Sequence, residues 1–183
     1  MNGWIWLLGL VVVIAVVIGW FITYYNRIRI LANRIEEAWA QIDVQLQKRF
    51  DLVPNLVETV KGYASHEREI FERVSEARSG MIRGTRGERM EANNALTGAL
   101  GRLFAVAEAY PELKASENFR LLQEQLEGIE NKIAYARQFY NSSVLNYNNL
   151  ITTIPGVWFA GGRAKHEFLE APEEAREAPK VEF

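Results

Sequence analysis

The chain has 183 residues, and 21 Lys and Arg against 23 Asp and Glu give it a formal net charge of −2 at pH 7. So balanced a charge does not attract nucleic acid phosphates in bulk, and we expect no nucleic acid partner. The chain has no Cys, which excludes disulfides, thiolate metal ligands, Cys nucleophiles and a lipid-modified cysteine anchor. Its length suffices for one domain with a core, with or without an anchor and a tail.

An uncharged apolar segment begins the chain. Residues from Trp4 to Ile22 are apolar, apart from the small residues Gly9 and Gly19. Nineteen residues in a helix extend about 28 Å, which matches the hydrocarbon core of a bilayer. No basic side chain precedes the segment and no small-residue cleavage site follows it, so it predicts an uncleaved transmembrane anchor over residues 1–26 rather than a signal peptide.

Positive charge lies on one side of this segment. Arg27, Arg29 and Arg34 follow it closely, whereas only the terminal amine precedes it. The positive-inside rule therefore predicts a single-pass membrane protein with its N-terminus outside and its C-terminal domain in the cytoplasm.

The next stretch, from Arg27 to Ala64, has apolar residues at every third or fourth position, which is typical of an amphipathic helix. They are Ile28, Leu31, Ile35, Ala38, Ile42, Leu46, Phe50, Val53, Val57 and Val60. Nothing interrupts the helix between the anchor and this stretch, so we expect the two to be continuous.

One short structural motif interrupts the pattern and includes Asp51, Pro54 and Asn55. Pro54 lacks an N–H and its ring clashes with the carbonyl of Phe50, which predicts a kink or a restart of the helix. Asp51 is then placed to accept a freed N–H as a cap.

Three further helices are predicted, and no segment alternates as a strand does. Ser65 is the predicted N-cap of a short helix that ends near Met81, and a turn follows at residues 80–87. The next helix is expected to end at Pro111, and the last is expected to start after Ser116 and stop at residues 155–156. The prediction is an all-α fold, in which the transmembrane helix is continuous with an antiparallel four-helix bundle over residues 27–155 with long first and last helices.

Residues 156–183 are predicted to form a membrane-proximal segment and an extended acidic tail. Four helices joined by hairpins bring the end of the fourth back to the membrane surface. Val157, Trp158 and Phe159 lie beyond that end, where no core awaits them, so we expect them to contact the lipid headgroups.

A polar repeat marks the last predicted helix. Tyr140 and Asn141 recur seven residues later as Tyr147 and Asn148, so each residue type forms a stripe along one helix face. One interpretation is core packing with local satisfaction of the amides. The other is a polar contact surface for a second chain.

No combination of residues indicates catalysis. His66 and His166 each precede a Glu, but neither has the second His that a zinc protease helix needs. The sequence also lacks a Gly-rich phosphate loop and a nucleophile elbow. We therefore expect no catalytic residue, no metal, no cofactor and no enzyme activity.

Several stretches together resemble the LemA family. They are Tyr25-Asn26, residues 38–46, 48–67 and 108–119, the two Tyr-Asn pairs, and the ending at residues 168–175 and 178–183. The resemblance implies bacterial origin, one N-terminal membrane span and an antiparallel helical bundle, and it supplies no catalytic residue. A branch of the family belongs to magnetosome membrane formation, which suggests membrane remodelling or assembly.

These features favour a non-enzymatic, membrane-anchored bundle that acts by contact with protein and membrane. The expected partners are membrane lipid, further copies of the chain in a homo-oligomer, and other membrane proteins, and tethering raises their effective concentration. The alternative is an accessory subunit of a membrane protease or transporter. A third hypothesis is an unrecognised enzyme, which would show a pocket with converging titratable groups.

Overall fold

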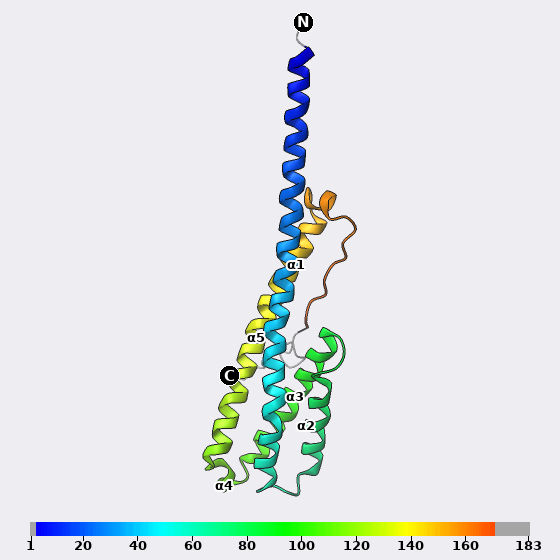
Figure 1. Ribbon diagram of the computed structural model, residues 1–183. Coiled ribbons are helices and arrows are strands. Elements are labelled where there is room, and N and C mark those ends of the chain that lie inside the picture. The colour runs from blue at the N-terminus through cyan, green and yellow to red at the C-terminus, as the bar shows by residue number, and fades with distance from the viewer. Residues whose placement is uncertain (1–2, 171–183) are drawn as a thin grey trace, which may run out of the picture. The chain divides into compact units, whose positions relative to one another are not determined.

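The computed structural model describes residues 3–170, and within them it contains helices and no strand (Figure 1). The elements are α1 (Gly3–Lys61), α2 (Arg68–Gly80), α3 (Arg86–Ala107), α4 (Pro111–Lys114), α5 (Glu117–Thr152) and the 3-10 helix η1 (Gly156–Phe159). The predicted all-α fold with long first and last helices is confirmed. The acidic tail predicted beyond residue 170 lies outside the described residues.

Helix α1 contains the predicted membrane segment. It runs without a break for 59 residues, so the predicted continuity between the apolar segment and the amphipathic stretch is confirmed. Within residues 3–170, α1 is the one helix long and apolar enough to cross a membrane, and no residue of its most apolar stretch is buried in the protein. A helix that is apolar on all sides and packs against nothing is suited to a lipid surrounding.

The described chain forms two compact units, of residues 3–38 with 139–168 and of residues 39–138 with 169–170. In the first unit, α1 packs against the end of α5 through apolar side chains that are fully or almost fully buried. These include Ile28, Ile35, Val144 and Ile151.

The second unit contains the rest of α1 and α5 together with α2, α3 and α4. Its core is built from the apolar faces of these helices. Fully buried members include Ile42, Leu46, Leu56, Val74, Met81, Leu96, Leu103 and Leu113. The turn between α2 and α3 ends in a capping box, in which Thr85 and Glu88 exchange backbone and side-chain hydrogen bonds.

Three predicted helix boundaries are wrong. The helix does not restart at Pro54, which lies inside α1. Ser65 does not cap α2, because the Ala64 and Glu67 N–H groups bond back to the Val60 and Ala64 carbonyls and carry the chain on to Arg68. Pro111 does not end α3, which ends at Ala107, but begins α4, where a missing N–H has no cost.

Candidate membrane-surface site

The connection after α5 packs against the end of the apolar segment. Within η1, the Phe159 ring stacks on Tyr24 with centroids 5.3 Å apart and meets Phe21 edge-on at 6.0 Å. Arg163 lies over the Tyr25 ring, 5.3 Å from its centroid. The connection therefore lies against the turn of α1 that follows the apolar segment, where headgroups would surround a spanning helix.

The three residues predicted to contact the membrane thus divide into two groups. Phe159 finds ring partners in α1, contrary to the expectation that no core awaited it. Val157 and Trp158 stay 42% and 69% exposed beside it. Their contact with lipid stays a prediction.

Gly156 makes this connection possible. A Cβ at this position would lie 2.0 Å from the Leu150 carbonyl oxygen, far inside van der Waals contact. Only glycine lets the chain pass so close to the last turns of α5 and present η1 to α1.

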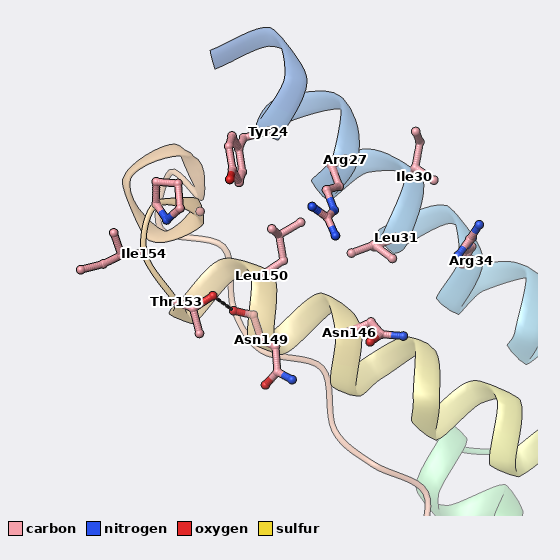
Figure 2. Close-up of a pocket in the computed structure, with 12 residues that line it drawn as sticks. Tyr24, Arg27, Ile30, Leu31, Arg34, Asn146, Asn149, Leu150, Thr153 and Ile154 are labelled. Atoms are coloured by element: carbon pink, nitrogen blue, oxygen red, sulfur yellow. Dashed lines mark hydrogen bonds between the residues drawn. The ribbon is translucent and has the colours of Figure 1, made fainter. Parts of the chain in front are cut away.

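A groove of about 590 Å³ lies between α1 and the end of α5 within the same unit (Figure 2). Arg27 and Leu31 project from α1 toward α5, and Leu150 projects from α5 toward α1 (Figure 2). Tyr24, Arg34, Asn146, Asn149 and Thr153 also line the groove. The lining has two guanidinium groups and no carboxylate.

The arginines after the apolar segment differ in their pairing. Arg29 donates to the Tyr25 hydroxyl at 3.4 Å and lies over its ring. Arg27 and Arg34 make no hydrogen bond or ion pair with any residue in the described part of the chain. The two arginines of the groove are therefore available to an anion.

The polar repeat predicted on α5 binds a segment of the same chain. Asn148 forms a pair of 2.9 Å hydrogen bonds with His166, from its Nδ2 to the His166 carbonyl and from the His166 N–H to its Oδ1. The Tyr147 ring packs on the His166 ring at 4.9 Å, and the Tyr140 hydroxyl donates to the Glu167 carbonyl at 3.5 Å.

We call residues 163–168 the C-terminal strap. Tyr140, Tyr147 and Asn148 are buried beneath it, and Asn141 is half-buried on the next face of α5. Of the two interpretations of the repeat, local satisfaction within the chain describes these three side chains. The strap has no regular secondary structure, as predicted for the start of the tail.

The structural motif at residues 51–55 connects two helices. Pro54 cannot donate to the Phe50 carbonyl, and Nε of Arg78 in α2 donates to that oxygen instead, at 2.9 Å. Asp51 does not cap a new helix but accepts from the Gln47 side chain at 2.9 Å. The Asn55 carbonyl accepts from the Thr59 hydroxyl.

The sequence analysis missed a buried ion pair. Arg49 is 2% exposed in the second unit, where it pairs with Glu130 and donates to Asn93 at 2.7 Å and Thr97 at 3.0 Å. Burial lowers the pKa of the Arg49 guanidinium, and the charge of Glu130 opposes that effect. The signal was the spacing itself, because Arg49 lies three residues after Leu46 and four before Val53, on the buried face of α1.

The titratable groups of the described residues are dispersed. Within residues 3–170, no three His, Asp or Glu side chains lie close enough together to hold a metal ion. His66 is exposed in the turn after α1, and His166 lies in the strap.

Comparison with known proteins connects this architecture to a family. Residues 38–183 match the LemA family. The chain is 27% identical to magnetosome protein MamQ of Magnetospirillum gryphiswaldense, over 85% of this chain and 69% of that protein. It is 26% identical to magnetosome proteins MamQ 1 and MamQ 2 of Paramagnetospirillum magneticum, over 81% of this chain and 65% of theirs, so it spans about two thirds of these relatives.

Proposed function

The chain belongs to the LemA family, and from that premise we propose that it is a non-enzymatic, membrane-anchored helical protein that assembles with copies of itself and thereby organises the membrane around it. One observation carries the proposal. Helix α1 continues from the apolar segment into the amphipathic stretch with no linker. Anchored copies would therefore present the same helix faces to one another at the surface of a membrane.

The relatives support the membrane-organising part of this proposal. They are magnetosome proteins by name, and the magnetosome branch of the family suggests membrane remodelling or assembly. The arginines that follow the apolar segment support an orientation with the C-terminal domain in the cytoplasm. A reporter enzyme fused after Phe183 tests the side.

A face of α5 in the second unit offers a surface for self-assembly. Leu121, Gly128 and Tyr135 are spaced by seven residues, which aligns them along one side of the helix. Leu121 is 43% exposed and Tyr135 is 76% exposed. A Cβ added at Gly128 would meet nothing within 4 Å, so a second helix has room to approach closely there.

Confinement to a membrane makes such a small surface sufficient. Tethered copies meet in two dimensions with a raised effective concentration, so a contact too weak to hold two soluble proteins together gains strength. The proposal therefore needs no large apolar interface.

Crosslinking of the full chain in membranes tests the assembly, with mass spectrometry separating self-contacts from contacts with other proteins. The expected result is a self-crosslink near Tyr135 that Tyr135→Glu abolishes. Tyr63→Glu, which changes another exposed Tyr of the second unit, serves as the matched control and should leave it intact. A chain that stays monomeric at membrane density contradicts self-assembly, and a stable one-to-one foreign partner favours the accessory-subunit alternative.

Membrane contact by the connection after α5 has its own test. A variant that keeps Trp158 and replaces Trp4, Trp6, Trp20 and Trp39 by Phe reports on this site alone. In vesicles with brominated lipids, we expect Trp158 fluorescence to be quenched, because an exposed indole beside Phe21 and Tyr24 would lie among the headgroups. Unquenched fluorescence excludes the contact.

A further inference from the structure

We infer that the groove between α1 and the end of α5 is a binding site for the headgroup of an anionic phospholipid. The inference rests on the membrane anchoring proposed above, and it is independent of self-assembly. Its basis is the position of two unpaired arginines in a groove of the first unit.

The depth of Arg27 matches that of a phospholipid phosphate. Arg27 follows Ile22 by five residues, so along α1 it lies ~7.5 Å beyond the apolar segment. The polar headgroup layer extends ~5–7.5 Å beyond the hydrocarbon core on each side. A spanning α1 therefore places the Arg27 guanidinium where lipid phosphates lie.

The groove extends from that depth away from the bilayer. Arg34 lies seven residues beyond Arg27, or ~10.5 Å further along α1, on the same groove lining. A volume of about 590 Å³ lies within the range of small-molecule sites and is ample for a phosphate with its headgroup alcohol. One phosphate at Arg27 can thus enter with its headgroup pointing toward Arg34.

The lining suits an anion with hydroxyl groups. Neither Arg27 nor Arg34 has an ion-pair partner among the described residues, and no carboxylate lines the groove to neutralise them. Arginine binds phosphate through charge-assisted hydrogen bonds, often two at once. Tyr24 and Asn146 add donors and acceptors at the rim for the headgroup alcohol.

The same helix provides a matched control. Arg29 follows Arg27 by two residues, so it lies at nearly the same depth and contributes the same charge near the membrane. It does not line the groove, and it already interacts with Tyr25. Replacing either arginine by Gln removes the same general attraction to anionic lipid, so a difference between the two variants isolates the groove.

The test reconstitutes the full chain in phosphatidylcholine vesicles with trace spin-labelled phosphatidylglycerol or spin-labelled phosphatidylcholine. Electron paramagnetic resonance gives the relative association of each labelled lipid with the protein. We expect the wild-type chain to prefer phosphatidylglycerol and Arg29→Gln to keep most of that preference. Arg27→Gln should fall below Arg29→Gln by about fivefold or more, the loss expected for a charge-assisted hydrogen bond beyond the general surface attraction.

A second variant fills the groove without changing charge. Asn146 is exposed, makes no hydrogen bond in the described chain and lines the groove, so Asn146→Phe should fold normally and exclude the headgroup. Its preference should fall as in Arg27→Gln while its far-UV circular dichroism stays unchanged. If Asn146→Phe keeps the wild-type preference, or if Arg27→Gln and Arg29→Gln fall equally, the groove is not the site.

Two further arms distinguish the source of the phosphate and the anchoring. Inorganic phosphate should displace labelled phosphatidylglycerol no more than sodium chloride of equal ionic strength does, and specific displacement would show a site for soluble phosphate instead. Flotation of the vesicles checks anchoring separately. A chain that does not float contradicts the anchoring itself, whereas a floating chain with no lipid preference contradicts the groove alone.

Discussion

The backbone carbonyl of Phe50 accepts a hydrogen bond from Nε of Arg78 at 2.9 Å, and the Arg78 guanidinium carbon lies 3.7 Å from the centroid of the Phe50 ring. In an uninterrupted helix this carbonyl would bond to the N–H of residue 54, which is Pro54. The position that proline leaves open on α1 is therefore where α2 attaches.

Replacing Arg78 by Met should destabilise the second unit by about 1–2 kcal/mol, because the Phe50 carbonyl loses its donor in a half-buried site. Pro54→Ala restores the N–H, so the same Arg78→Met change should cost clearly less in that background. Urea unfolding in detergent, followed by circular dichroism, measures the cycle. Arg73→Met is the control, since exposed Arg73 pairs only with Glu69 one turn away. Equal costs in both backgrounds would disprove the substitution of one donor for the other.

The buried Arg49 should make its partner more sensitive than itself. Glu130→Ala leaves a guanidinium charge buried without a counter-ion and should cost about 3 kcal/mol of unfolding free energy. Arg49→Met leaves only a partly exposed carboxylate and should cost less.

The double variant Arg49→Met with Glu130→Leu should unfold within about 1 kcal/mol of the wild-type chain or above it, because it removes both charges from the core. Glu124→Ala, which removes an exposed acid that pairs with Arg120, provides the baseline at less than about 0.5 kcal/mol. A double variant less stable than either single variant would contradict this account.

The start of α3 should make stability depend on pH in the acidic range. The Thr85 backbone N–H, and then its hydroxyl, lower the pKa of Glu88 below its ordinary value of 4.5. Since the folded pKa is the lower one, this stabilisation is fully present above the unfolded pKa and is lost as the pH falls through the folded one.

Glu88→Gln should therefore be less stable than the wild-type chain at neutral pH, and the difference should shrink as the pH falls below about 4.5. Unfolding in urea across a pH series measures it. Glu91→Gln, an exposed acid one turn later for which no cap bond is present in the described chain, should give a difference that stays near zero. A Glu88→Gln difference that persists at low pH would exclude ionisation as its cause.

The C-terminal strap should detach when its amide pair is removed. Asn148→Ala deletes both hydrogen bonds to His166, so the His166 amide should exchange its hydrogen faster and the strap should be cleaved sooner by added protease. Asn146→Ala, a change of the same type two residues away on the exposed side of α5, should alter neither. Unchanged exchange at His166 in Asn148→Ala would mean that Tyr140 and Tyr147 hold the strap without it.

Regular spacing of apolar residues allowed the helices to be predicted well. The apolar run from Trp4 and the three- and four-residue spacing after it are local properties, so they predict α1 and its continuity from the sequence alone. The same holds for α5, whose 36 residues match the predicted long last helix.

The features that could not be predicted depend on contacts between distant residues. A proline in a helix usually signals a break, and nothing near Pro54 shows that Arg78 will supply the missing donor 28 positions after Phe50. Likewise Asn148 and His166 are 18 residues apart, and their pairing depends on how the chain turns at Gly156. The groove exists only because α1 and α5 approach each other, so no single segment indicates it.

The packing of Phe159 on Phe21 and Tyr24 also determines how mechanical force would pass through the first unit. A pull on the strap reaches the stacked rings beside the apolar segment before it can separate α5 from α1. The load would thus enter the bilayer almost directly, through a few aromatic side chains at the base of the protein. A partner that tugs on the end of the chain would strain the lipid while leaving the helices above it folded.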